Sequence, residues 1–292
     1  MKSNPINYLL SKLRDYCTLT KPEVNLLILM TTSAGYYLSC RGPLNIVGLL
    51  NTVVGTLLVA SGTATLNQWM ERTWDGQMRR TANRPLPSGR LSAREAFLFG
   101  VSLSIAGGLY LAVVVNRLAA VLAISTLLSY LLIYTPLKRK TPLCTLLGAF
   151  PGAMPALIGW AGASARIDSH AWFLFAILFL WQFPHFLAIA IMYREDYARA
   201  GYRMLPNCDR DSRFTRAEIL GFTMILIVTT MLPIVDRGGP LYVAGMLLAG
   251  VFLLYHGTRL ARSSAKVAAS RLVHASVVYL PMVLGVIVAR KA

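Results

Sequence analysis

Three oxygen-bearing side chains recur at intervals of four residues where an apolar segment of the sequence ends. Asn67, Glu71 and Asp75 stand at positions i, i+4 and i+8, so on an α-helix they share one face. Two carboxylates and an amide oxygen suit Mg²⁺, above all a Mg²⁺ that substrate phosphates also hold. The alternative is a solvated helix end paired with Arg72 and Arg79. Because acids that emerge from an apolar span are costly and usually functional, we predict that the three residues are metal ligands.

A basic loop follows this stripe directly. Arg80 and Arg84 could bind phosphate, because guanidinium groups offer planar, bidentate donors. Pro85, Pro87 and Gly89 are expected to end the helix and fold the loop back toward the carboxylates. A loop that only sets membrane topology would explain the basic residues but not the close spacing of the two prolines and the glycine.

A second acidic cluster, Glu195 and Asp196, follows a later apolar segment. Asp196 could bind a second Mg²⁺ or complete the shell of the first. Glu195 is the weaker candidate, because an adjacent residue points about 100° away on a helix. Asp209 and Asp211 lie beyond a proline among arginines and are interpreted as solvated loop charges.

Tyr134, Lys138 and Arg139 close another apolar segment on the same side of the chain. They would add phosphate donors at the level of the acidic clusters. The alternative is that these basic residues only set the topology.

His185 lies inside the apolar segment 171–192, in an aromatic motif that begins at Trp181. It precedes Asp196 by about three helical turns, so on one continuous helix both would share a face at a separation of ~16 Å. A histidine this deep in an apolar helix is a functional candidate. It could ligate haem iron, act in acid–base chemistry, or form a hydrogen bond with a neighbouring helix.

The composition shows which elements must position these residues. Of the 292 residues, 55% are apolar and only 14% are charged, with a mean hydropathy of +0.55. Soluble domains carry about 25% charged residues. The formal charge of +17 lies in short clusters between long apolar runs. These features exclude a soluble globular enzyme, a disordered chain and a nucleic-acid-binding protein, and they predict an integral membrane protein.

Nine apolar segments have the length needed to cross a bilayer as helices. They are residues 24–40, 44–66, 96–115, 118–136, 143–162, 171–192, 217–235, 240–258 and 273–289. No linker divides the chain, so we expect one all-α domain over residues 1–292, with nine transmembrane helices around a central apolar cavity. The four scattered cysteines indicate neither a disulfide framework nor a zinc site.

The basic residues predict the orientation. Alternate connections place 23 of the 29 lysines and arginines on one side and 6 on the other. The positive-inside rule therefore puts the N-terminus in the cytoplasm and the C-terminus outside. The same rule accounts for most of the net charge without a polyanionic partner.

Four motifs together resemble one known family: NxxxExxxD, MxRTxxRPLPxG, WQxPHF and EDYxxAGxxMLP. They are similar to those of the protohaem IX farnesyltransferase branch of the UbiA-type intramembrane prenyltransferases, over roughly residues 22–288. The resemblance implies nine helices in a bacterial-type inner membrane and a Mg²⁺-dependent site facing the cytoplasm. It also implies farnesyl diphosphate as donor, haem B as acceptor, and a haem A synthase or terminal oxidase as assembly partner.

Motif matching distributes the site residues between the two substrates. The diphosphate and Mg²⁺ role falls on Asn67, Glu71, Asp75 and Asp196, with Arg80, Arg84, Tyr134, Lys138 and Arg139 around them. His185 would serve the haem. The chain departs from the family pattern at Cys144, where Asn is expected, and at Ala156, where a second proline is usual.

Two alternative functions remain open at this point. A sister prenyltransferase would act on a quinone precursor or a chlorin, and the absence of WQxPHF would have favoured it. A transporter or channel could use Asn67, Glu71 and His185 as an ion path. That class, however, has no reason to place an Arg/Pro/Gly loop beside each acidic cluster.

Overall fold

The protein, seen in a computed structural model, is described over residues 5–232, 239–263 and 265–291. Within these ranges the regular structure is helical and contains no strand. The helices are α1 (Pro5–Leu19), α2 (Pro22–Ser39), α3 (Ile46–Asp75), α4 (Ala93–Tyr110) continued by the π-helical η1 (Leu111–Val115), α5 (Arg117–Leu128) continued by η2 (Ser129–Tyr134) and α6 (Thr135–Leu137), α7 (Cys144–Ser164), α8 (Ser169–Met192), α9 (Arg194–Arg199), α10 (Leu205–Cys208), α11 (Arg213–Met231), α12 (Pro240–Ser263) and α13 (Lys266–Lys291).

The predicted membrane-spanning architecture is confirmed. In the described ranges, eight helices are long and apolar enough to cross a membrane. The 18-residue α2 occupies the place of the remaining predicted span. Residues 233–235 of the seventh predicted span, and Lys2 and Arg237 of the orientation count, lie outside the described residues. The chain is therefore an all-α integral membrane protein, and its central cavity stays a prediction.

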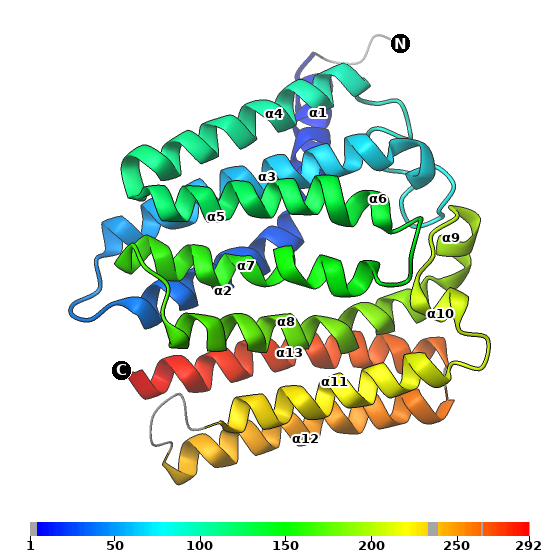
Figure 1. Cartoon of the computed structure of the whole chain (residues 1–292). Helices are drawn as coiled ribbons and strands as arrows, with labels where there is room; N and C mark the ends of the chain where they lie inside the picture. The colour runs from blue at the N-terminus through cyan, green and yellow to red at the C-terminus, as the bar shows by residue number, and fades with distance from the viewer. Residues whose placement is uncertain (1–4, 233–238, 264, 292) are drawn as a thin grey trace.

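The long helices lie side by side and gather their polar connections at one end of the bundle (Figure 1). The loop after α3, the end of α6, and the short helices α9 and α10 meet at this end. Helix α13 ends at the opposite one. The largest group of buried apolar side chains draws on α7, α8, α11, α12 and α13, and it forms the core behind the polar end.

Helices α2 and α7 cross at very short range because two glycines face backbone across the contact. A Cβ atom on Gly35 would lie 2.2 Å from the carbonyl oxygen of Ala156, and one on Gly159 would lie 1.9 Å from that of Thr32. Small residues at a membrane helix contact permit this approach of the two backbones. The crossing fixes α2, and with it the turn that precedes α2 at the polar end.

The Gly159→Ala variant is therefore expected to lose about 1–3 kcal/mol of stability, since its methyl group would force the two helices apart. Thermal unfolding in detergent measures the loss. Gly221→Ala in α11 is the matched control, because a Cβ there meets nothing within 4 Å. Equal stability of the two variants would contradict the importance of the crossing.

The last helix, α13, packs against α2. The ammonium group of Lys291 donates hydrogen bonds to the carbonyl oxygens of Tyr37 and Cys40, where α2 ends. A cation at a helix C-terminus also interacts favourably with the helix dipole. Helix α13 thus contacts α2 as well as α8 and α12.

Helix α1 is the one long helix in the described ranges that the search for spans did not predict. Ion pairs of Lys12 with Glu95 and of Asp15 with Arg90 hold it against the start of α4 and the loop before it. Most of its apolar side chains, such as Leu9 and Leu13, remain exposed, whereas Leu19 at its end is buried. This pattern is typical of a helix that lies in the membrane interface.

Candidate active site

The predicted stripe forms the last turns of one unbroken helix. Asn45 caps the start of α3 by accepting a hydrogen bond from the backbone of Gly48 at 2.9 Å, and the helix continues for 30 residues to Asp75. The side chains of Asn67, Glu71 and Asp75 are all buried. The spacing in the sequence therefore translates into one buried polar face, as predicted.

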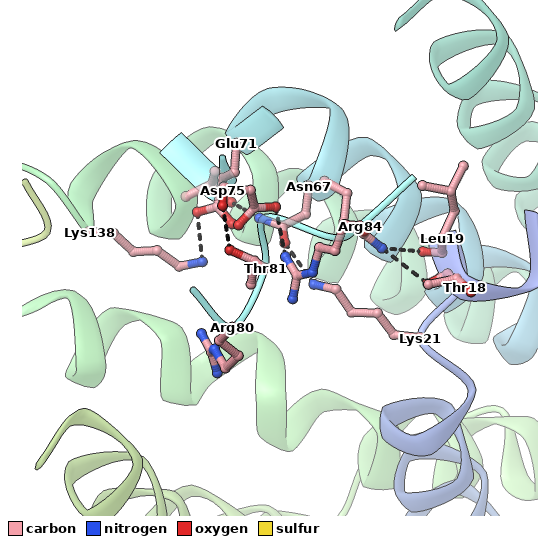
Figure 2. A network of polar contacts seen from close by, with 12 residues as sticks. Thr18, Leu19, Lys21, Asn67, Glu71, Asp75, Arg80, Thr81, Arg84 and Lys138 are labelled. Carbon is pink, nitrogen blue, oxygen red and sulfur yellow. Dashed lines mark hydrogen bonds and ion pairs between the residues drawn. The ribbon is translucent and has the colours of Figure 1, made fainter. Parts of the chain in front are cut away.

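Each side chain of the stripe accepts a hydrogen bond from a basic group of the same chain (Figure 2). The contacts are Lys21 Nζ to Asn67 Oδ1 at 2.9 Å, Lys138 Nζ to Glu71 Oε1 at 2.8 Å, and an Arg84 guanidinium nitrogen to Asp75 Oδ2 at 2.7 Å. Three cations thus converge on two carboxylates and an amide. The predicted alternative, in which Arg72 and Arg79 pair with the acids, is wrong: Arg72 donates to the carbonyl oxygen of Trp69.

The end of α6 places Lys138 deep in this network. Burial alone would lower the pKa of Lys138, but the Glu71 carboxylate outweighs it and raises the pKa well above the ordinary value. The ammonium group also lies 4.5 Å from the centre of the Tyr134 ring. Thr135, one turn earlier, accepts a hydrogen bond from the Asn67 amide at 3.1 Å. The end of this short helix therefore orients Asn67 and Glu71, the first two side chains of the stripe.

Lys21 is a site residue that the sequence analysis missed. It stands between α1 and α2 in the left-handed region, with φ 51° and ψ 65°. Burial, together with the charges of Arg84 and Lys138, lowers the pKa of Lys21 to about 7. The signal available in the sequence is a Lys-Pro pair at the start of an apolar segment. Nothing in its spacing indicates contact with Asn67, which is 46 positions away.

The loop between α3 and α4 folds back as its prolines and glycine predict. The backbone N–H groups of Arg90 and Leu91 both donate to the carbonyl oxygen of Pro85, and Gly89 has φ +73°. The hydroxyl of Thr81 donates to the Asp75 carbonyl oxygen at 2.7 Å. This return of the chain brings Arg84 onto the carboxylate of Asp75.

The second acidic cluster meets the same loop from its other side. Asp196 is buried and accepts hydrogen bonds from the backbone N–H of Arg80 at 3.2 Å and from the guanidinium of Arg199. The Arg80 side chain lies over the Tyr193 ring at 4.5 Å and donates to the hydroxyl of Tyr197. Asp196 thus fixes the position of the basic loop.

Two further predicted residues lie at the edge of the site. Arg139 is exposed and lies over the Trp74 ring at 4.5 Å. Glu195 is also exposed, as expected for the weaker of the two candidate metal ligands in the second acidic cluster. Across the described ranges, no group of three His, Cys, Asp or Glu side chains is placed to hold one ion. Asp196 therefore does not join Glu71 and Asp75 in a single acidic triad.

The predicted alignment of His185 with Asp196 is wrong. Helix α8 ends at Met192, Tyr193 leaves the helical region with φ −110° and ψ 26°, and α9 begins at Arg194. A helical register cannot be carried across this break. His185 instead contacts Ser276 of α13, with its Nδ1 atom 2.7 Å from the hydroxyl oxygen.

Asp209 also differs from its prediction as a solvated charge. It is buried, and its carboxylate accepts hydrogen bonds from the backbone N–H and the hydroxyl of Thr215 at 2.7 and 2.9 Å. These bonds satisfy donors at the start of α11 and hold the pKa of Asp209 below its usual range despite the opposing effect of burial. Asp209 is thus a structural residue.

The two departures from the family pattern fit the local packing. Cys144 is buried at the start of α7, with its sulfur 3.6 Å from that of Met204. Ala156 is also buried, where α7 crosses Gly35 of α2. Neither side chain enters the polar network.

The donor atoms of the stripe fit a hard divalent cation. One amide and two carboxylate oxygens on adjacent turns are the ligand types that Mg²⁺ prefers. The hydroxyl of Tyr202 is buried beside the Glu71 carboxylate of the stripe. Burial and the nearby Glu71 carboxylate raise the pKa of Tyr202, so its hydroxyl keeps its proton.

Comparison with known proteins shows which family and which relatives this chain is similar to. Residues 28–278 match the UbiA prenyltransferase family. A protoheme IX farnesyltransferase of Solibacter usitatus is 49% identical over 94% of this chain and 97% of the relative. A protoheme IX farnesyltransferase of Koribacter versatilis is 43% identical over 94% and 93%.

Two solved structures share the fold. One, described as a digeranylgeranylglyceryl phosphate synthase in membranes, has a TM-score of 0.78 at 18% identity and covers 96% of this chain and 98% of that one. A UbiA homolog from Archaeoglobus fulgidus bound to GPP and Mg²⁺ has a TM-score of 0.66 at 17% identity, over 94% and 99%. The family match and the relatives lead to one conclusion: this chain belongs to the UbiA prenyltransferase family.

Proposed function

We propose that the protein transfers the farnesyl group of farnesyl diphosphate to a vinyl group of haem B. The observation that carries the proposal is the convergence of Lys21, Arg84 and Lys138 on the stripe of α3. Such a group of cations and oxygen ligands suits a diphosphate that arrives with a divalent cation. The names of the full-length relatives support the choice of farnesyl donor and haem acceptor.

The reaction begins with cleavage of the bond between the farnesyl C1 atom and the diphosphate oxygen. The diphosphate leaves with the electron pair, and the vinyl group of the haem attacks the allylic cation. Water then adds to the resulting cation and loses a proton, which gives a hydroxyethylfarnesyl product. The buried apolar side chains around the polar end exclude other water from the cation until the vinyl group has attacked.

The protein groups have separate tasks in this scheme. Asn67, Glu71 and Asp75 would hold Mg²⁺, which acts as a Lewis acid toward the leaving diphosphate. The Archaeoglobus fulgidus homolog bound to GPP and Mg²⁺ has the same fold, which supports a divalent metal here. Lys21 and Arg84 donate to the phosphate oxygens, where negative charge develops as the bond breaks.

A membrane assay tests the proposal. Membranes that contain the protein are incubated with haem B, farnesyl diphosphate and Mg²⁺, and the product is identified by mass. We expect haem B to gain a farnesyl group and a hydroxyl group, with release of one diphosphate. Prenylation of an added quinone precursor or chlorin, with none of haem, would favour the sister enzyme. Absence of diphosphate release with every acceptor would exclude prenyl transfer.

The Lys21→Gln variant is expected to bind farnesyl thiodiphosphate, an unreactive analogue, about tenfold or more weakly, because it loses one charge-assisted phosphate contact. Isothermal titration with the purified protein measures the affinity. Lys12→Gln is the matched control, since Lys12 pairs with Glu95 outside the network. Unchanged affinity in Lys21→Gln would remove Lys21 from the phosphate site.

Reporter fusions test the proposed orientation in a bacterial inner membrane. The asymmetry of 23 against 6 basic residues predicts that fusions after residues 90 and 205 report the cytoplasm, and that one at residue 292 reports the periplasm. A cytoplasmic C-terminus would contradict the nine-span topology. In this orientation the diphosphate site faces the cytoplasm, and the product remains in the membrane for a haem A synthase or a terminal oxidase.

A further inference from the structure

A buried serine in the last helix contacts the ring of His185. Ser276 in α13 is fully buried, and its hydroxyl donates a hydrogen bond to the carbonyl oxygen of Val273 at 2.7 Å. The same hydroxyl oxygen lies 2.7 Å from the Nδ1 atom of His185 in α8. The two contacts cannot be assigned independently, because a serine hydroxyl has only one proton.

The position of that one proton determines the tautomer of the His185 imidazole. A carbonyl oxygen cannot donate, so the proton of Ser276 must point to Val273. The contact with His185 is then a hydrogen bond in which Nδ1–H donates and the serine oxygen accepts. In a neutral imidazole only one nitrogen carries a proton. Nε2 is therefore the unprotonated nitrogen, with its lone pair directed away from Ser276.

Neighbouring aromatic groups fix both partners of this hydrogen bond. The indole N–H of Trp181 donates to the backbone carbonyl oxygen of Ser276 at 2.7 Å, which ties α8 to α13 at this level. The Trp181 ring stacks on the imidazole with 4.8 Å between ring centroids and 18° between planes. Phe186 meets the imidazole edge-on at 5.3 Å. The ring is therefore held on one face, at one edge and at Nδ1.

The Nε2 atom is left available. Among the described residues it has no hydrogen-bond partner, and the His185 side chain is only half-buried. No hydrogen-bonding group of the described residues therefore occupies this nitrogen. An immobilised imidazole with a free Nε2 is ready to act as a Lewis base.

We propose that Ser276 is a positioning residue that holds His185 in the Nδ1–H tautomer and so presents Nε2 to the iron of the haem acceptor. The identity of the acceptor rests on the proposed function, whereas the tautomer rests on the contacts of Ser276 alone. The hydrogen bond at one ring nitrogen commonly decides which nitrogen binds a metal. Such supporting partners typically contribute about 10- to 100-fold to metal affinity.

The first arm of the test needs no haem. Protein labelled with ¹⁵N-histidine contains four histidines, and His185→Gln identifies the His185 signals in a solid-state NMR spectrum. We expect the shifts of an Nδ1–H tautomer in the unmodified protein. Ser276→Ala should give a mixture of tautomers, and Ser276→Thr, which keeps the hydroxyl, should restore one form. An Nε2–H tautomer in the unmodified protein, or no change in Ser276→Ala, would overturn the proposal.

The second arm measures ferric haem binding by the Soret band of the same variants. Ser276→Ala should weaken binding about tenfold or more, with recovery in Ser276→Thr. Ser104→Ala is the matched control, because Ser104 is also buried and donates to a helix carbonyl oxygen but does not contact a histidine. Binding of farnesyl thiodiphosphate by every variant confirms that each is folded.

The two measurements distinguish a failure of the proposed haem site from a failure of the positioning role of Ser276. The tautomer could respond as expected while neither His185→Gln nor Ser276→Ala changes haem binding. In that case the placement of the acceptor in the proposed function is wrong, and the proposed role of Ser276 toward the iron is wrong too. If haem binding needs His185 but is indifferent to Ser276, the positioning role alone is overturned.

Discussion

The Asp75→Asn variant is expected to lose prenyl transfer by a factor of about 10² to 10³ or more while it remains folded. The substitution keeps the size of the side chain and removes its charge. The buried oxygen can still accept from Arg84, and the Asp75 carbonyl still accepts from Thr81, so the loop should keep its place. What is lost is a negative ligand for the cation that the diphosphate brings. Initial rates with haem B and farnesyl diphosphate measure the effect.

The same variant should also lose the Mg²⁺ dependence of farnesyl diphosphate binding. Asp211→Asn, which makes the same change at an exposed position, should leave both properties unchanged. Near-normal activity in both Asp75→Asn and Asp196→Asn would show that the acidic clusters are structural, and the proposed mechanism would fail.

Replacement of Lys138 by Met is expected to destabilise the protein by about 3–5 kcal/mol, because it leaves the Glu71 carboxylate buried without its partner. The ion pair has an N–O distance of 2.8 Å, and both side chains are nearly inaccessible. Since Glu71 raises the pKa of Lys138, the contribution of the lysine is present at neutral pH and is lost only as the pH rises through that raised pKa. The loss should therefore be constant across the neutral range. Thermal unfolding in detergent at several pH values measures it.

The double variant Lys138→Met with Glu71→Leu separates stability from chemistry. Replacing both charges by apolar groups is often neutral or stabilising, so most of the lost stability should return. Activity should not return, because the double variant lacks both a proposed phosphate donor, Lys138, and a proposed metal ligand, Glu71. A double variant as unstable as Lys138→Met would show that the site depends on other features of these residues.

The stripe and the return of Arg84 toward it were predictable from local sequence, whereas the distant partners of Asn67 were not. The stripe of Asn67, Glu71 and Asp75 follows from a local period of four residues, and α3 is continuous through it. Lys21 and Thr135 meet Asn67 from 46 and 68 positions away. Such contacts depend on how the helices pack, and a single sequence holds no local signal for them.

The errors have the same physical origin. The spacing of His185 and Asp196 would align them only on a continuous helix, and the break at Tyr193 removes that premise. Asp209 carries the composition of a solvated loop, yet the fold uses it to satisfy the backbone at the start of α11. In both cases a local pattern was extended across a point where tertiary structure decides.

The contact of α13 with α2 and α8 has a consequence for biosynthesis. Residues 21–138 supply every basic group that pairs with the stripe, so this network can form while the ribosome is still translating the second half of the chain. The contact of His185 with Ser276 joins positions 91 apart, and that of Lys291 with Tyr37 joins positions 254 apart. Chains fold from the N-terminus as they are made. The growing polypeptide therefore forms the network that we propose binds diphosphate early, and His185 receives its supporting hydroxyl only when the final helix enters the membrane.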